Sequence, residues 1–232
     1  MIATALAGPR RPFSGAVRDY VLGLGLINGK GERLNFGGQV MKNVAGYDVS
    51  RLLVGSFGEL GAITEVSLKV LPVSEFVCTY AAQLSMTETL KLVKFLQRKM
   101  TPITGVSHSE GIAYIRMAGR QETVERFAAS QSWRIEMSQQ ASYACYWQAL
   151  RDFSLSVFES QQDTSVYCLS LPKFSACAIQ SEGLLMDWAG ARYWLRIDND
   201  DESGLQALQQ EAERLGGFVR IFGSGSDAHL LP

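Results

Sequence analysis

The chain has 232 residues, of which 47% are apolar and 19% are charged, a composition typical of a folded globular protein and not of a disordered one. Its 22 basic and 23 acidic residues give a net charge of −1, so no excess of positive charge indicates binding to nucleic acid or to an anionic membrane surface. No stretch reaches the ~20 apolar residues of a membrane span, and the N-terminus lacks the basic flank and apolar core of a signal peptide. These features predict a soluble cytoplasmic protein with one large or two modest domains.

Cysteine and histidine usage gives no indication of a metal site. No Cys-x-x-Cys spacing joins the four cysteines, which are Cys78, Cys145, Cys168 and Cys177, and the histidines are His108 and His229. Neither set has the spacing of zinc ligands, so we expect no metal and reduced thiols that pack as small apolar side chains. His108 stands between two serines, but we expect a loop between two strands there and assign no catalytic residue.

Glycine divides the chain into two regions. Twelve of the 22 glycines lie at or before Gly61, and glycine is needed where φ is positive or where the backbone approaches something closely. The first region is therefore expected to be tightly turned, and the remainder to be ordinary packed α+β structure. Pro72 follows an apolar run and cannot continue a central strand, so we expect domains at 1–72 and 73–232.

In the first region, the sequence Asn28-Gly29-Lys30-Gly31 separates apolar runs at 20–27 and 32–36, which predicts a β-hairpin. Asp48 is expected to cap a short helix over 49–54 that ends at Gly55 in the left-handed conformation. From 62 to 70 the residues alternate, with Ala62, Thr64, Val66, Leu68 and Val70 on one face. This pattern predicts a half-buried strand.

Beyond Pro72, strand and helix patterns alternate. Apolar and β-branched runs predict strands at 76–84, 112–117, 166–171, 193–197 and 218–222, and helical spacing predicts helices at 86–100, 122–130, 143–158, 174–185 and 205–215. Helices placed between antiparallel strands predict an open sheet with helices on one face.

The segment from Val54 to Ile63 carries glycine at every third position, at Gly55, Gly58 and Gly61. Such a loop offers backbone amides with no side chains in the way, which suits a phosphate or the carbonyl edge of a flavin ring. It is neither a P-loop nor a Rossmann fingerprint, because no Gly-Lys-Ser/Thr follows and the order is helix, loop, strand. A purely structural turn explains the spacing equally well.

The residues around the loop carry a family resemblance. The segments Gly37–Asp48, Val54–Ile63 and Thr64–Pro72, together with Thr4–Gly23 upstream, closely resemble the second half of the vanillyl-alcohol-oxidase-type (PCMH-type) FAD-binding domain. Within that family, the FAD-binding subunits of bacterial glycolate oxidases have the Lys-Asn-Val-Ala-Gly-Tyr-Asp sequence that stands here at 42–48. The resemblance implies an α+β fold: the second lobe of a PCMH-type FAD-binding domain at 1–72, followed by an α+β cap domain at 73–232 with an antiparallel sheet.

The resemblance also implies where FAD would bind. The cofactor would lie between the two domains and be lined by two backbone segments, namely Thr4, Ala5, Leu6, Ala7 and Gly8, and Phe57, Gly58, Glu59, Leu60, Gly61, Ala62 and Ile63. A side chain at Gly58 or Gly61 would then strike the cofactor, and the Thr4 hydroxyl would donate a hydrogen bond to it. Lys42, Tyr47, Asp48 and Arg51 are expected to hold the loop from behind, because a capping aspartate explains their position without a catalytic role.

The function implied by the resemblance is that of an FAD-binding subunit in a glycolate oxidase complex, which oxidises glycolate to glyoxylate. The implied partners are a homologous catalytic FAD subunit and an iron–sulfur subunit, through which the complex could lie at the inner membrane. Because this chain has no histidine cluster to act as a base, we expect the 2-hydroxy acid substrate to be oxidised on the partner, with this chain's flavin serving electron transfer or assembly.

Two features of the family are missing from this chain, an earlier lobe with its own glycine-rich loop and a closing segment. We therefore expect a fragment that alone binds FAD weakly or not at all. The alternative is a non-catalytic scaffold that no longer binds FAD. Its interface anchors would be the aromatic residues of 143–147 together with Trp188, Tyr193 and Trp194, although packing in the core explains the same residues.

Overall fold

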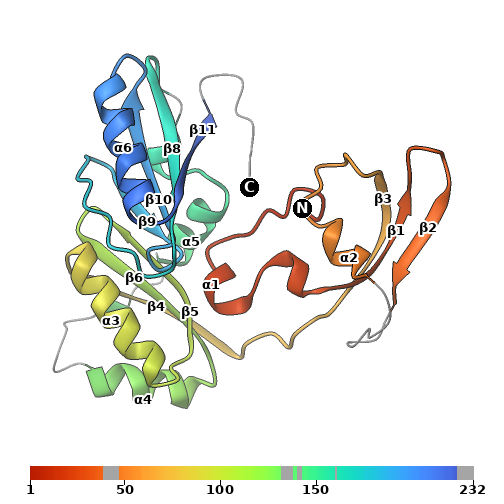
Figure 1. The fold of residues 1–232 in the computed structure, drawn as a ribbon. Coiled ribbons are helices and arrows are strands. Elements are labelled where there is room, and N and C mark those ends of the chain that lie inside the picture. Colours follow the sequence, from red (N-terminus) through yellow and green to blue (C-terminus); the bar gives the residue numbers. More distant parts are fainter. Residues whose placement is uncertain (39–46, 132–137, 140–142, 160, 224–232) are drawn as a thin grey trace. The chain divides into compact units, whose positions relative to one another are not determined.

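The computed structural model describes residues 1–38, 47–131, 138–139, 143–159 and 161–223 (Figure 1). Two compact units make up the chain. Among the described residues, unit 1 contains those within 1–7 and 14–73, and unit 2 contains those within 8–13 and 74–223. The short helix α1 (Arg11–Ser14) and the 3-10 turn η1 (Val17–Asp19) lie where the chain returns to unit 1. The assignment of these units as a flavin lobe and a cap stays a prediction.

Unit 1 is built on a three-stranded antiparallel sheet. Its strands are β1 (Val21–Ile27), β2 (Arg33–Gly37) and β3 (Ala62–Leu68), in the order β2-β1-β3. The predicted hairpin between β1 and β2 is confirmed. Its turn is fixed by the Asn28 side chain, whose Oδ1 accepts hydrogen bonds from the amides of Lys30 at 2.9 Å and Glu32 at 3.0 Å.

Helix α2 (Val49–Leu52) packs on this sheet through Leu53, which is buried with Val21, Leu24 and Leu26. Asp48 caps the helix as predicted, its side chain accepting from the Arg51 amide at 3.1 Å. The helix is two residues shorter than expected, and Gly55 follows it in the left-handed conformation with φ +85°. Lys42 and most of the Lys-Asn-Val-Ala-Gly-Tyr-Asp sequence lie outside the described residues.

The simple alternation predicted for 62–70 is wrong, because β3 contains a bulge. Gly25 of β1 pairs with Glu65, whereas the next residue, Leu26, pairs with Ile63. An extra residue on one strand shifts the phase of the side chains. Ile63 and Val66 therefore both pack on the unit 1 core, and Ala62, Thr64 and Leu68 are exposed.

Unit 2 is built on an eight-stranded sheet in which all neighbouring pairs are antiparallel. The strand order is β11-β8-β10-β9-β5-β6-β4-β7. The strands are β4 (Phe76–Gln83), β5 (Ile103–Ser109), β6 (Ile112–Gly119), β7 (Ser138–Gln139), β8 (Thr164–Ser170), β9 (Leu185–Asp187), β10 (Arg192–Asp198) and β11 (Phe218–Gly223). The predicted α+β fold with an antiparallel sheet is confirmed.

Helices cover the sheet unequally (Figure 1). On one face, α3 (Met86–Arg98), α4 (Gln121–Gln131) and α6 (Glu202–Arg214) bury Val93, Val124 and Leu208 against the larger core. The opposite face, called the α5 face here, carries α5 (Tyr143–Arg151) and the 3-10 turn η2 (Ser156–Phe158). There Trp147 of α5 packs in a second cluster with Trp194.

Three local predictions in unit 2 are wrong. Residues 174–185 form no helix: Phe174 has φ +68°, and long-range hydrogen bonds replace helical ones, from the Tyr193 hydroxyl to the Ser175 carbonyl at 2.6 Å and from the Ala178 amide to Glu211 at 2.7 Å. Residues 107–109, expected to be a loop, end strand β5. The predicted helix at 143–158 ends at Arg151.

Of the aromatic residues considered as interface anchors, Trp147, Trp188, Tyr193 and Trp194 are each at most 8% exposed, whereas Tyr143 and Tyr146 are partly exposed. Core packing therefore accounts for the four buried residues. The four cysteines are free thiols, and no group of three potential metal ligands occurs within the described residues. Among the described helices, none is long and apolar enough to cross a membrane.

Candidate functional site

In unit 1, the structure brings the N-terminal segment together with the glycine-rich loop that follows α2. The Gly55 amide donates to the Ile2 carbonyl at 3.1 Å, and the Phe57 amide donates to the Ala3 carbonyl at 2.9 Å. Ala5 and Phe57 both adopt the left-handed conformation, with φ near +50°, which non-glycine residues rarely do and which concentrates at ligand sites. The two segments that the family resemblance assigns to FAD are thus neighbours through residues 2–5 and 55–57.

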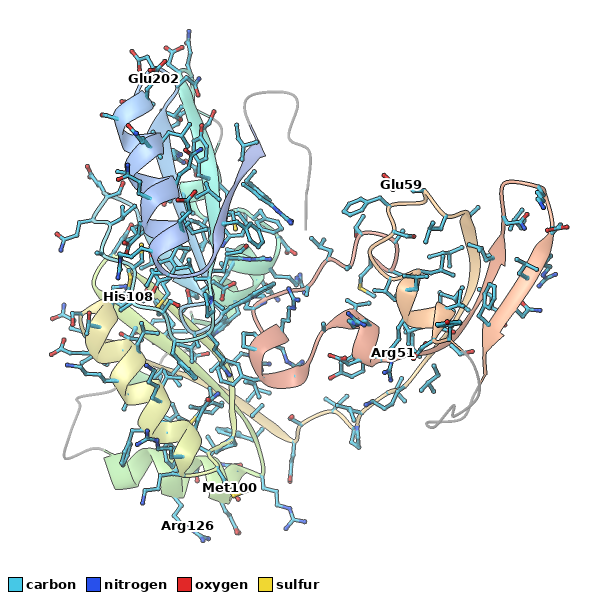
Figure 2. The ribbon with its side chains drawn as sticks, viewed as in Figure 1. Arg51, Glu59, Met100, His108, Arg126 and Glu202 are labelled. Carbon is cyan, nitrogen blue, oxygen red and sulfur yellow. The ribbon has the colours of Figure 1, made fainter. Side chains whose placement is uncertain are left out.

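The tip of the loop presents free backbone donors. The Glu59 amide is satisfied by the Ser56 carbonyl at 2.9 Å, and Glu59 lies at the outer end of the loop (Figure 2). By contrast, the amides of Gly58 and Leu60 make no hydrogen bond to any residue that the structure describes. A Cβ added at Gly58 would meet nothing within 4 Å. The backbone here is therefore open to a ligand.

The side chains around these amides complete an amphipathic surface. The Ser56 hydroxyl is buried and has no hydrogen-bond partner among the described residues, a state that costs roughly 1–3 kcal/mol unless a ligand or water satisfies it. Phe57 and Leu60 are 44% and 49% exposed. Apolar side chains beside unpaired donors match the chemistry of a flat ligand with a carbonyl or phosphate edge.

Gly61 has a different reason to be glycine. A Cβ at this position would lie 2.5 Å from the Ile27 carbonyl oxygen, and φ is +143°. The next residues, Ala62 and Ile63, are paired in β3 with Ile27 and Leu26. The close approach of β1 therefore explains why residue 61 is glycine without a cofactor. At Gly58 no atom of the described chain would clash with a side chain, so packing does not explain the glycine there.

Thr4, Leu6, Ala7 and Gly8 are the other residues that the resemblance assigns to the site. The Thr4 hydroxyl donates a hydrogen bond to the Met1 carbonyl at 3.2 Å and so stabilises a local turn. Leu6 is exposed and Ala7 is half-buried. Gly8 belongs to unit 2, where its carbonyl accepts from the Trp188 indole at 3.1 Å.

The polar residues on α2 have structural contacts. Arg51 forms an ion pair with the capping residue Asp48 at 3.3 Å, and both side chains are about half exposed. Tyr47 is almost fully exposed. Arg51 lies on α2 in Figure 2, away from the tip of the loop at Glu59. The Asp48–Arg51 contact holds the start of α2, but the exposed Tyr47 gives no support to the predicted role of these residues in holding the loop from behind.

His108 lies on β5 as a buried structural residue. Its Nε2 is 2.7 Å from the Leu84 carbonyl, and burial lowers the pKa of the imidazole. The neighbouring Ser107 hydroxyl donates to the Met186 carbonyl at 2.8 Å and is 2.7 Å from the Tyr146 hydroxyl. Neither contact is that of a nucleophile with its base.

Strands β9 and β10 carry a polar cluster that was not predicted from the sequence. Asp187 and Arg192 are opposite each other in the register of the two strands, and Asp187 is 3% exposed. Burial raises the pKa of Asp187 to about 7. The sequence carried one signal for this cluster, a turn at 188–191 between two apolar runs. The helix wrongly predicted at 174–185 drew attention away from that turn.

Comparison with known proteins supports the family resemblance of the sequence. The chain is 36% identical over 225 residues to the glycolate oxidase subunit GlcE of Escherichia coli, a match that covers 97% of this chain and 61% of that protein. The chain is a homologue of this subunit. The resemblance predicted from the sequence is thereby confirmed, and the chain spans less than two thirds of the length of its relative.

Shorter matches lie in related oxidoreductases. The glycolate oxidase subunit GlcD of Bacillus subtilis is 48% identical over 61 residues, which are 26% of this chain and 13% of that protein. A D-lactate dehydrogenase of Archaeoglobus fulgidus is 36% identical over 104 residues, 44% of this chain and 24% of that protein. No family model matches the chain.

Solved structures confirm the fold. An alkyldihydroxyacetonephosphate synthase superposes with a TM-score of 0.61 at 13% identity, over 93% of this chain and 51% of that one. At this identity the likeness concerns the fold alone.

Proposed function

We propose that this chain has the function of an FAD-binding subunit of a glycolate oxidase or a closely related 2-hydroxy acid dehydrogenase. The observation that carries the proposal is the 36% identity to GlcE along 97% of the chain. Relatives with the names D-lactate dehydrogenase and FAD-linked oxidoreductase support both the substrate class and the cofactor.

The residues of unit 1 fit a flavin cofactor. The open space at Gly58, the free amides of Gly58 and Leu60 and the orphaned Ser56 hydroxyl together offer hydrogen bonds to one edge of a planar ligand. Phe57 and Leu60 would supply the apolar contact. The segment from Thr4 to Ala7 would line the same ligand, since its neighbours are hydrogen-bonded to the loop.

When bound, FAD supplies the electron acceptor for oxidation of a 2-hydroxy acid to the 2-oxo acid. The protein's contribution in unit 1 is to hold and orient the cofactor and to exclude water from one edge of it. No described side chain of unit 1 has the geometry of a general base. We therefore assign the removal of the substrate's proton to a partner subunit related to GlcD, with an iron–sulfur subunit as the further electron acceptor.

The test is an FAD titration monitored by flavin fluorescence. The full chain is titrated alone and again with the part of GlcE that the alignment leaves uncovered, supplied as a separate polypeptide. Gly58→Val is compared with Gly31→Val, because both glycines have positive φ and open space around the missing Cβ, but Gly31 lies in the β1–β2 turn. The two variants have the same backbone strain and differ in their distance from the loop.

We expect wild type and Gly31→Val to quench flavin fluorescence. Gly58→Val is expected to lose this quenching. If folded wild type quenches no flavin under either condition, the flavin proposal fails and the non-catalytic scaffold becomes the better explanation. Equal effects of the two valines would show that the loop has no special relation to FAD.

A further inference from the structure

Residues 8–13, called the strap here, belong to unit 2, although the segments on either side of them belong to unit 1. Pro9 and Pro12 fix two of the backbone φ angles of the strap. Pro9 is buried, and Phe13 packs against the larger core of unit 2. The strap is therefore a stiff piece of chain that is docked on unit 2.

The beginning of the strap is held by Trp188, in the turn between β9 and β10. The indole Nε1 donates to the Gly8 carbonyl at 3.1 Å, and the Arg11 guanidinium carbon lies 4.5 Å from the centroid of the indole ring. Trp188 is 8% exposed and has φ +54°, at a turn position that glycine, asparagine or aspartate normally takes. The backbone preference of the turn does not explain a tryptophan there, whereas the contacts of its side chain do.

The end of the strap is held by Lys173. Its Nζ donates to the Pro12 carbonyl at 3.2 Å. The same atom lies 4.7 Å from the centroid of the Phe13 ring and 5.0 Å from that of the Phe174 ring. An ammonium group at these distances is attracted to the faces of aromatic rings. Lys173 thus contacts both the backbone and a side chain of the strap.

The turns that carry Trp188 and Lys173 are joined to each other. The Phe174 amide donates to the Ala189 carbonyl at 2.9 Å. A Cβ at Gly190 would lie 2.8 Å from the Ser175 carbonyl oxygen, so the two turns also pack closely. The strap is therefore held at both of its ends by one continuous surface of unit 2.

The strap continues directly into the N-terminal segment of unit 1. The Ala3 carbonyl accepts from the Phe57 amide of the glycine-rich loop at 2.9 Å, and the Gly8 carbonyl accepts from Trp188. Between these two fixed carbonyls lie only residues 4–7, which are the residues proposed to line the flavin. Holding both ends of so short a segment removes most of the conformations that it could otherwise adopt.

We propose that Trp188 and Lys173 are positioning residues for the flavin. By holding the strap on unit 2, they keep residues 4–7 in the conformation that lines the cofactor. The inference rests on the proposed function, because residues 4–7 are assigned to FAD there. Without the strap contacts, only a fraction of the molecules has residues 4–7 in place at any time, and the apparent affinity for FAD falls by that fraction.

The experiment uses two matched pairs of variants in the full chain. Trp188→Phe is compared with Trp147→Phe, since both indoles are 8% exposed and donate one hydrogen bond, that of Trp147 to Thr79 at 2.8 Å. Lys173→Met is compared with Lys94→Met, since Lys94 lies 5.5 Å from the same Phe174 ring but has no printed contact with the strap. In each pair, only the first variant removes a hydrogen bond to the strap.

Three measurements are made on each variant. FAD is titrated by flavin fluorescence, under the condition in which wild type quenches it. The circular dichroism of the flavin is recorded at saturating FAD, because it reports the surroundings of the bound ring and not the stability of the chain. Hydrogen exchange in peptides from residues 1–13 reports the strap itself and needs no cofactor.

We expect Trp188→Phe and Lys173→Met each to weaken FAD binding about threefold to tenfold, as expected for one lost hydrogen bond. Both should change the flavin dichroism and speed exchange in the peptides from 1–13. Trp147→Phe and Lys94→Met should match wild type in all three measurements. Lys173→Arg should retain most of the affinity, because a guanidinium group also donates and stacks on aromatic rings.

The failures of the two proposals are distinguishable. A pair whose members have equal FAD affinity and equal flavin dichroism overturns the role of the residue that it tests and leaves the proposed function intact. If folded wild type binds no FAD, the proposed function fails, and this inference fails with it. Lys173 is exposed, so its pair decides the matter where Trp188→Phe does not fold.

Discussion

Gly58 and Gly61 provide a comparison in which the same substitution has two different physical costs. Both have positive φ, at +85° and +143°. Alanine in a left-handed conformation costs about 1–2 kcal/mol. At Gly58 that is the whole cost, because the added Cβ meets nothing within 4 Å.

At Gly61 the added Cβ also collides with β1. It would lie 2.5 Å from the Ile27 carbonyl oxygen and 3.0 Å from a Leu26 methyl group. Both neighbours belong to the pairing of β1 with β3, so relief requires the strands to separate. Forced overpacking costs a further ~1–3 kcal/mol, which gives a total of about 2–5 kcal/mol for Gly61→Ala. Unit 1 has a small core around Val21, Leu24, Leu26 and Leu53, so this change is expected to unfold much of it.

The assay must report the two units separately. All four tryptophans of the chain stand beyond residue 130, so their fluorescence during urea denaturation reports unit 2. Hydrogen exchange in peptides from β1 and β3 reports unit 1. Gly61→Ala should lose protection in β1 and β3 and leave the tryptophan transition unchanged, whereas Gly58→Ala should retain most of the protection. Equal protection in the two variants would refute the assignment of Gly61 to strand packing.

Three further changes test unit 2 by urea denaturation. The pKa of Asp187 is raised to about 7, so between about pH 4 and 7 the folded chain holds a proton that the unfolded chain has lost. The free energy of unfolding should therefore fall by up to about 4 kcal/mol as pH rises from about 4 to 7. Asp187→Asn should remove this decline. Trp147→Phe breaks the indole's 2.8 Å hydrogen bond to Thr79 and should cost about 1–3 kcal/mol, less in a Thr79→Val background. Ser85→Ala removes the capping box that Ser85 forms with Glu88 at the start of α3, and it should cost about 1 kcal/mol. An unchanged urea midpoint would contradict the prediction concerned.

Local signals predicted the elements that local interactions hold. The Asn28 turn and the Asp48 cap were correct because the side chain that fixes each is within four residues of its partner. The helix predicted at 174–185 failed because its hydrogen bonds run to Tyr193 and Glu211, and no pattern within the segment reveals them. The same limit applies to β3, where the bulge depends on the pairing partner β1.

The candidate site shows a similar division. The glycine spacing indicated an exposed backbone, and the structure shows which glycine fits that explanation. Spacing treats Gly58 and Gly61 alike, because both permit positive φ, but only the fold shows that β1 lies against one of them. The buried Ser56 hydroxyl without a partner carries no signal in the sequence at all.

The hairpin at Asp187 and Arg192 extends this reasoning to charge. The sequence has nearly equal numbers of acidic and basic residues, and that balance gave no indication of binding to nucleic acid or to an anionic membrane. Three arginines nevertheless come together from β10, β11 and the segment 8–13, which are far apart in the sequence. Net charge limits the partners that large surfaces attract, but it does not limit a small site that the fold assembles from distant residues.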